Sequence, residues 1–344
     1  MAARNVLHGM MLEEVRGLSR RRPPGAALKG AAQMRKLTLG STSLEVTPIC
    51  HGCWQASPKF WGEQPRERLV AALRRAIDTG VNFIDTADAY GDGLSEEIVG
   101  EALAPFQRGQ VIVATKVYHH FYPDGRRHPD LSHDYVLAEC DASLKRLRMD
   151  YVDLYQLHSF DPLTHMEETT RALEKLKSSG KIRHYGVSNF TVEQLSWARR
   201  HGSYETLQPR FSLLHTEAEK DILPFCRMEN IGVLVYSPLC NGLLTGKYNG
   251  AETFSDFRGK NPDFQGERFR KAAAAVQSLA PIASKYSATL TQLVLAATLA
   301  TPLIDCAIVG IKTPEQIEEA AGAADIMLER EDYFAIRQKF AGLG

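Results

Sequence analysis

From Met34 onward, short apolar runs alternate with segments in which apolar residues recur every three to four positions. A short apolar run bounded by turn residues is typical of a buried strand, and the longer spacing is typical of an amphipathic helix. The predicted strands begin near Pro48, Asn82, Val111, Val152, Arg183, Thr206, Gly232 and Cys306.

The segments between these strands predict helices. In residues 66–79, Leu69, Leu73 and Ile77 share one face, and Gly80 ends the pattern. Further helices are predicted at 135–147, 166–179, 191–200, 217–229, 270–286 and 314–324. Eight strands that alternate with helices predict a parallel (β/α)8 TIM barrel with C-terminal helices. An open doubly wound sheet is the alternative, but the Gly-x-Gly-x-x-Gly turn usual after its first strand is missing.

One connection is much longer than the others. Residues 240–269 join the seventh predicted strand to the next helix and are rich in Gly, Asn, Asp and Phe. Such long connections are usually functional or disordered. Because this one follows a barrel strand, we interpret it as a lid or cofactor clasp on the catalytic face. A mobile surface decoration is the alternative.

Residues 1–33 differ in character from the rest of the chain. They contain three consecutive arginines at 20–22, followed by Pro-Pro-Gly at 23–25, and their basic residues outnumber their acidic ones. We predict a disordered N-terminal extension here, with residues 34–344 forming a single barrel domain. An organelle-targeting peptide is the alternative, although the acidic residues argue against it.

The charge of the chain excludes some classes of partner. Lysines and arginines number 41, and so do the acidic residues, within 344 residues. Without net charge, no broad field attracts nucleic acid or an anionic membrane. No apolar run reaches the roughly 18 residues of a transmembrane helix, and the N-terminus lacks the layout of a secretory signal. We expect a cytoplasmic protein that acts on a small molecule, with no indication of its oligomeric state.

The six cysteines are mostly far apart, which suits free thiols. Cys50 and Cys53 have C-x-x-C spacing, but they end the apolar run 46–53, which is interpreted as a strand. Residues three apart on a strand point to opposite faces, so a structural role is favoured over a redox or zinc site.

Four reactive side chains stand where consecutive predicted strands end. Asp85 ends the second strand, Tyr90 lies in the turn after it, Lys116 ends the third strand and His158 the fourth. Side chains at these ends meet on one face of a barrel. A phenol is protonated at neutral pH, and a neighbouring lysine lowers its pKa. We therefore predict Tyr90 as proton donor, with Asp85 holding Lys116 and His158 orienting a carbonyl oxygen.

These residues belong to segments with a specific sequence. The segments are 85–91 (DTADAYG), 114–116 (ATK), 155–158 (YQLH), 180–183 (GKIR), 186–190 (GVSNF), 236–239 (YSPL) and 242–248 (GLLTGKY). They resemble the aldo-keto reductase superfamily, in particular its bacterial branch of inositol and general-stress reductases. The resemblance extends from residue 34 to about residue 340.

The resemblance implies a barrel that binds NADPH or NADH in extended form. It implies Tyr90 as the acid, Asp85 and Lys116 as its modulators, and His158 as the carbonyl-orienting group. Along the cofactor it implies Ser188, Asn189 and Gln208 at the carboxamide, Tyr236 on the nicotinamide ring, Ser237, Leu239 and Lys247 along the pyrophosphate, and Gly310, Lys312, Gln316 and Glu319 at the adenosine end.

The adenosine end departs from the common family pattern. Gly310 stands where several NADP-selective members have Lys or Arg. Lys312 is expected to contact the 2′-phosphate instead, so NADP is the predicted cofactor and NAD the alternative.

The loops after the first and third strands are expected to form the substrate pocket, with Trp54, Tyr118 and His119 as its residues. Aromatic rings with interspersed donors suit a sugar, a cyclitol, a polar aldehyde or an aromatic carbonyl. The third-strand loop also holds His120 and His128, but the proposed chemistry needs no metal and none is predicted.

The predicted function is an NAD(P)H-dependent oxidoreductase that interconverts an aldehyde or ketone and an alcohol. One alternative is an enzyme that keeps NADP tightly bound and performs net redox-neutral chemistry on a sugar-like substrate. Another is a cofactor-sensing regulatory subunit, as in the potassium-channel β subunits that share this barrel.

Overall fold

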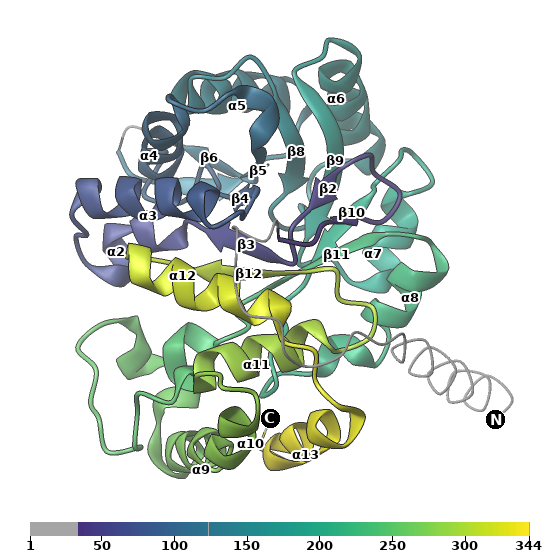
Figure 1. Cartoon of the computed structure of the whole chain (residues 1–344). Helices are drawn as coiled ribbons and strands as arrows, with labels where there is room; N and C mark the ends of the chain where they lie inside the picture. Colours follow the sequence, from purple (N-terminus) through teal and green to yellow (C-terminus); the bar gives the residue numbers. More distant parts are fainter. Residues whose placement is uncertain (1–33, 123, 344) are drawn as a thin grey trace, which may run out of the picture.

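The computed structural model describes residues 34–122 and 124–343, and the predicted N-terminal extension lies outside them. Within these residues, eight parallel strands form a closed barrel in which the last strand pairs with the first (Figure 1). They are β3 (Ile49–Gly52), β4 (Phe83–Asp85), β5 (Ile112–Val117), β8 (Val152–Leu157), β9 (Ile182–Ser188), β10 (Thr206–Gln208), β11 (Gly232–Tyr236) and β12 (Cys306–Gly310). The TIM-barrel prediction is confirmed, and every predicted strand start lies within one residue of the observed one.

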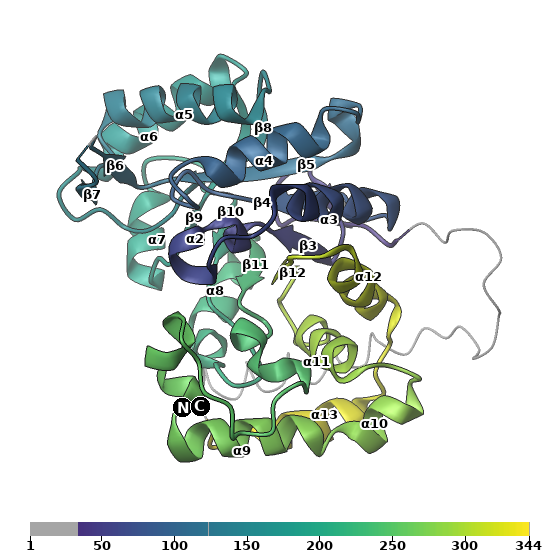
Figure 2. The ribbon, with the colours of Figure 1, turned by 90° about the vertical axis from the view of Figure 1, so that its left-hand side faces the viewer.

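Helices surround the barrel. They are α3 (Arg66–Asp78), α4 (Leu94–Leu103), α5 (His133–Leu147), α6 (Met166–Ser178), α7 (Val192–Ala198), α8 (Ile222–Met228), α11 (Leu290–Leu299) and α12 (Pro314–Gly322). A further layer, formed by α9 (Gly266–Gln277), α10 (Ala280–Lys285) and α13 (Arg330–Phe340), lies outside α11 (Figure 2). The C-terminal helices expected from the sequence are therefore α12 and α13.

Two predicted helices are each divided in the structure. Residues 217–229 form a short 3-10 turn, η3 (Glu217–Glu219), and then α8, which begins where the Asp221 carboxylate accepts from the Ile222 amide. The segment 270–286 is split into α9 and α10, and Pro281 stands in the first turn of α10. Proline lacks an amide hydrogen, so it is tolerated in a first turn and breaks a helix interior.

The barrel interior is filled by apolar side chains and closed at its amino end by the hairpin β1 (Leu37–Thr38) and β2 (Glu45–Val46). The run 46–53 is therefore not one strand, because Val46 ends β2 before β3 begins. Cys50 points into the barrel interior and Cys53 belongs to the outer core. All six cysteines are buried and free, which agrees with their structural interpretation.

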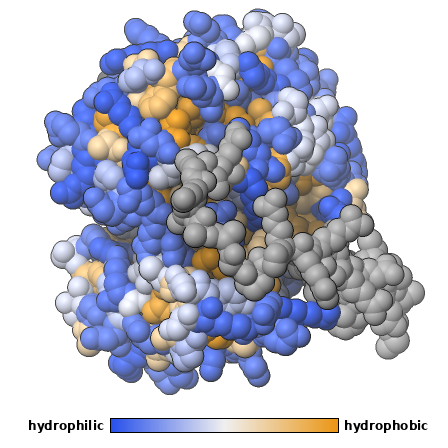
Figure 3. Space-filling view, in the orientation of Figure 1, coloured by the Kyte–Doolittle hydropathy of each residue, from blue (hydrophilic) through white to orange (hydrophobic). Residues whose placement is uncertain are grey.

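The outer surface of the barrel is largely polar. Hydrophilic residues dominate the face in Figure 3, with hydrophobic residues in small patches between them. Among the described residues, no helix has the length and apolar character needed to cross a membrane.

Candidate active site

A cavity of about 1020 Å³ opens at the carboxyl ends of the barrel strands. Its walls come from the ends of seven barrel strands, from the turn after β4, from α11 and α12, and from three connecting segments. These segments are η1 (Trp54–Ala56) with α2 (Pro58–Trp61), the hairpin β6 (His119–Phe121) with β7 (Arg127–Pro129), and the long loop with η4 (Cys240–Thr245), η5 (Phe257–Lys260) and η6 (Pro262–Phe264). The hairpin and α2 lie on the same side of the barrel (Figure 2).

Lys116 joins two of the predicted catalytic groups. Its Nζ lies 2.6 Å from Asp85 Oδ1, 2.8 Å from the Thr86 carbonyl oxygen and 3.3 Å from Tyr90 Oη. The lysine side chain is fully buried, so it acts on the cavity only through Tyr90 and Asp85, which line it. The second Asp85 oxygen accepts a hydrogen bond from Gln208 Nε2 at 2.8 Å.

The electrostatics of this group keep Lys116 charged and Tyr90 protonated. Burial disfavours the lysine ammonium, but Asp85 and Tyr90 outweigh it and raise the pKa of Lys116 above its usual value. Burial raises the pKa of Tyr90 to about 12, although Lys116 acts in the opposite direction. The lowered pKa expected from the sequence is therefore wrong in its net direction, because desolvation exceeds the attraction of one lysine. At neutral pH the phenol holds its proton, as a proton donor must.

His158 shares the cavity with Tyr90. The two rings meet edge to face, with centroids 5.7 Å apart and planes at 79°. Burial, followed by the charge of Lys116, lowers the pKa of His158 well below its usual value, so the imidazole is neutral. The buried Nδ1 has no hydrogen-bond partner among the described residues. A neutral imidazole and a phenol can both hydrogen-bond one carbonyl oxygen placed between them.

The residues expected along the cofactor all line this cavity. At the inner end, Asn189 Nδ2 donates to the His158 carbonyl oxygen at 3.0 Å, and Asn189 Oδ1 accepts from Tyr236 Oη at 2.8 Å. Asn189 has φ of 59°, a left-handed conformation that asparagine tolerates well. Gln208 uses its Nε2 on Asp85, so its Oε1 is the atom left for a ligand amide.

Three cations gather at the outer end. Burial lowers the pKa of Lys312, and the nearby charges of Arg258 and Lys247 lower it further. The Lys312 ammonium lies 4.5 Å from the centre of the Trp61 ring. The Asp256 carboxylate pairs with Arg258 and partly offsets this charge. Lys312 and Lys247 still favour an anion here, and the phosphates of a dinucleotide have that chemistry.

Packing explains why position 310, at the outer end of the cavity, is a glycine. A Cβ atom at position 310 would lie 1.9 Å from Gln55 Nε2, so the buried Gln55 side chain fills the space that a longer residue would need. Gln55 itself lines the cavity and carries no sequence motif that identifies it.

Two of the three expected substrate residues line the cavity. Trp54 and His119 line the cavity, but Tyr118 does not, and its hydroxyl donates to the Phe160 carbonyl oxygen at 3.3 Å. Consecutive residues in extended chain point to opposite sides, so only one of the Tyr118–His119 pair can face the cavity. Tyr118 instead packs its ring edge to face against His119, with centroids 4.7 Å apart, and its role at the substrate stays a prediction.

Three arginines of the cavity were not found from the sequence. Arg210 follows β10 by two residues, so the rule of strand ends could have found it. Arg127 is placed by the pairing of a short hairpin, and Arg258 by the long loop. The sequence around Arg127 and Arg258 has no alternation of apolar and polar residues, so it does not predict which way either side chain points.

The long loop crosses the cavity and packs against α2 and η1. Phe257 contacts Trp61 and Trp54, with ring centroids 4.9 and 5.4 Å apart. Asp263 anchors the loop, and its carboxylate contacts His215 Nε2 at 2.7 Å and Arg268 Nε at 2.8 Å. These contacts hold the loop against the wall of the cavity, and its role as a cofactor clasp stays a prediction.

Comparisons with known proteins agree with this geometry. The sequence model of the Aldo/keto reductase family matches residues 48–341. The chain is 37% identical to the aldo-keto reductase YhdN of Bacillus subtilis (strain 168), over 87% of this chain and 91% of that protein. It is 33% identical to the NADH-specific methylglyoxal reductase of Escherichia coli (strain K12), over 89% of this chain and 98% of that protein.

Among solved structures, the glycerol dehydrogenase AKR11B4 of Gluconobacter oxydans superposes with a TM-score of 0.82 at 34% identity, covering 89% of this chain and 95% of that one. The family match, the sequence relatives and the superposed barrel all extend over most of the chain. The protein therefore belongs to the aldo/keto reductase family.

Proposed function

We propose that this protein is an NAD(P)H-dependent oxidoreductase that interconverts an aldehyde or ketone and an alcohol, with Tyr90 as general acid in reduction and general base in oxidation. The observation that supports it best is the buried Lys116, which bridges Asp85 and Tyr90 beneath a cavity that also holds His158. Burying an ammonium is costly even when a carboxylate pairs with it, and buried charged groups with shifted pKa values beside a cavity are typical of functional sites.

Each residue has a defined part in reduction. The nicotinamide, when bound, supplies the hydride. His158, being neutral, donates a hydrogen bond to the carbonyl oxygen and fixes its position. Tyr90 gives its proton to that oxygen as charge develops there. Lys116, 3.3 Å from Tyr90 Oη, stabilises the phenolate that results, and Asp85 keeps the lysine charged and oriented.

The proposed cofactor is NADP, with NAD as the alternative. Asp256 offsets the charge of Arg258, but Lys312 and Lys247 remain at the outer end of the cavity, and Lys312 is a cation that can bind a phosphate beyond the pyrophosphate. Lys312 is assigned to the 2′-phosphate. The NADH-specific relative keeps the alternative open.

The proposed substrate is a small polar carbonyl compound. Trp54 gives the cavity an aromatic wall, and His119 and Arg127 give it hydrogen-bond donors. Two of the relatives are named for methylglyoxal and glycerol, which are small, oxygen-rich molecules.

A screen that follows the near-ultraviolet absorbance of NADPH and NADH tests this function. Its substrates are methylglyoxal, sugars, oxidised inositols and aromatic aldehydes, and Tyr90→Phe is the control. Carbonyl-dependent oxidation that Tyr90→Phe lacks supports the proposal. Substrate consumption without any cofactor exchange would indicate redox-neutral chemistry. Negligible turnover on every carbonyl, with stable binding of a partner protein, would indicate a sensing subunit.

A further inference from the structure

The β6–β7 hairpin presents different residues on its two faces. His119 and Arg127 line the cavity. His120 and His128 stand directly opposite each other across the two strands, and alternation along a strand directs them to the other face. Side chains paired in this way have Cβ atoms about 5 Å apart, which suits a shared ligand.

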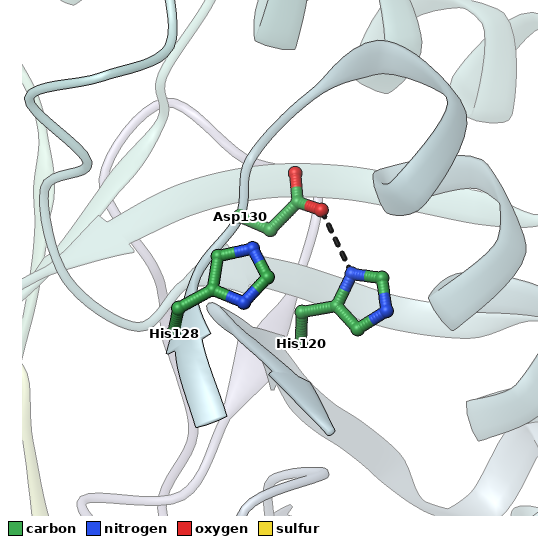
Figure 4. Close-up of side chains that lie close together, drawn as sticks. All are labelled: His120, His128 and Asp130. Carbon is green, nitrogen blue, oxygen red and sulfur yellow. Dashed lines mark hydrogen bonds and ion pairs between the residues drawn. The ribbon is translucent and has the colours of Figure 1, made fainter. Parts of the chain in front are cut away.

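Asp130 completes a group of three on this outer face. One ligand atom from each of His120, His128 and Asp130 can be chosen so that all lie within 4.8 Å of one another. His120 Nδ1 is already 2.9 Å from Asp130 Oδ2. Figure 4 shows the two imidazoles side by side, with the carboxylate adjacent to both. Among the residues that the structure describes, no other group of His, Cys, Asp and Glu meets this condition.

Two of the three side chains are held in place. The His120 ring stacks on Tyr135, with centroids 4.5 Å apart and planes at 13°, and it also stacks against Tyr122 at 4.8 Å and 17°. Asp130 Oδ1 accepts from the Ser132 amide at 3.0 Å, which leaves Oδ2 directed at His120. A site whose ligands are already oriented loses little conformational entropy on binding.

We propose that His120, His128 and Asp130 bind a divalent transition-metal ion, with Zn²⁺ the best match. Two imidazole nitrogens and one carboxylate oxygen form a common zinc ligand set, and a water completes the tetrahedron. The six cysteines are buried and do not compete for the ion. No metal is predicted from the sequence because the redox chemistry needs none, and this site lies outside that chemistry.

Binding requires one side chain to move. Zinc–ligand bonds of about 2.1 Å place the ligand atoms of a tetrahedron about 3.4 Å apart, so atoms up to 4.8 Å apart must approach. The His120 and His128 rings are nearly parallel, at 18° and 5.1 Å, and a metal must lie in the plane of each ring. His128 is exposed and can turn about its side-chain bonds, whereas His120 is held by its stack.

The site would act on the hairpin as a clip. A metal ion held by both strands would restrain β6 against β7, and the opposite face of the same strands carries His119 and Arg127 into the cavity. Metal binding at this site is therefore expected to change the affinity for substrate more than the affinity for cofactor. The metal site itself rests only on the hairpin geometry and stands even if the proposed function is wrong.

Titration calorimetry with ZnCl2, on tag-free protein freed of metal by a chelator, tests the proposal. One ion per chain is expected, and His128→Ala and Asp130→Ala are each expected to weaken binding at least tenfold. Co²⁺ in place of Zn²⁺ should give a tetrahedral visible spectrum that His128→Ala abolishes.

His133→Ala is the matched control. His133 and Asp134 form a neighbouring imidazole–carboxylate pair at 2.7 Å, outside the group of three. This variant is expected to bind zinc as the unchanged protein does. The absence of zinc binding at micromolar concentration, or an ion retained by both His128→Ala and Asp130→Ala, would overturn the proposal. A thermal melt of each variant shows that it is folded, so loss of binding is not loss of structure.

Discussion

Gln208 and Asp85 are joined by a hydrogen bond of 2.8 Å between two buried side chains, Gln208 Nε2 and Asp85 Oδ2. The other Asp85 oxygen contacts Lys116, and Lys116 contacts Tyr90. A residue assigned to the cofactor carboxamide is thereby linked, through two further groups, to the proposed proton donor. If the cofactor carboxamide binds Gln208 Oε1 as proposed, it would fix the amide that orients Asp85.

Gln208→Leu is expected to lower both stability and turnover. It removes the donor to a buried carboxylate, and a hydrogen bond to a charged group contributes about 1.5–3 kcal/mol. We expect the free energy of unfolding to fall by about 2 kcal/mol and kcat to fall about tenfold. Gln156→Leu is the control, because the buried Gln156 amide has no hydrogen-bond partner among the described residues. Equal destabilisation by both variants, in urea melts, would refute the link.

Lys312→Ala is expected to weaken NADPH more than NADH. Removal of a cation from the 2′-phosphate costs one charge-assisted contact, which corresponds to about a tenfold or larger loss of NADPH affinity. Fluorescence titration with each cofactor measures it. Lys260→Ala removes an exposed lysine of the long loop, outside the cavity lining, and should leave both affinities unchanged. Equal weakening of NADPH and NADH binding by Lys312→Ala would show that Lys312 does not contact the 2′-phosphate.

Gly310→Ala is expected to destabilise the protein through Gln55. The new Cβ would stand 1.9 Å from Gln55 Nε2, so the buried amide side chain must leave its place. Because the end of the flexible Gln55 side chain lines the cavity and can shift, the cost is expected at the low end of overpacking, about 1 kcal/mol. In the double variant with Gln55→Ala the clash is absent, and thermal melts should show most of that loss recovered. If the two effects simply add, the steric explanation of Gly310 fails.

Asp263→Asn is expected to remove a contribution to folding stability that is present at neutral pH and lost in acid. His215 and Arg268 outweigh burial and hold the pKa of Asp263 at about 2, below its usual value. A lowered pKa stabilises the folded state above the unfolded-state pKa of about 3.9, and this contribution is lost as pH falls toward 2. Its size is of the order of 2 kcal/mol at neutral pH. In urea melts the difference between the two proteins should therefore be largest at neutral pH and shrink between pH 4 and 2. A difference independent of pH would contradict this.

Much of the fold was accessible from the sequence because its signals are local. Each barrel strand is an apolar run bounded by turn residues, and the predicted catalytic residues follow directly from where those runs end. Helix α11 was missed because it is apolar on nearly every side, so its pattern has no polar face. The hairpin β6–β7 was missed because its sequences, HHF and RHP, do not alternate polar with apolar residues.

The parts of the site that could not be predicted depend on distances between segments far apart in the chain. Arg258 reaches the cavity through a loop whose course is set by Phe257 and Asp263. The pKa of Tyr90 depends on the balance of burial against Lys116, and the sequence identifies the lysine but not the depth of burial. The group of His120, His128 and Asp130 likewise required the register of the hairpin.

The most direct test of the account is the Tyr90→Phe variant, measured by steady-state turnover of the best substrate found and by fluorescence titration with NADPH. Loss of the phenolic proton is expected to reduce kcat by about 10²- to 10⁴-fold, while the cofactor dissociation constant changes less than about twofold. The ring and its packing against His158 are retained, so the barrel should remain folded. Turnover near that of the unchanged protein would show that Tyr90 is not the proton donor.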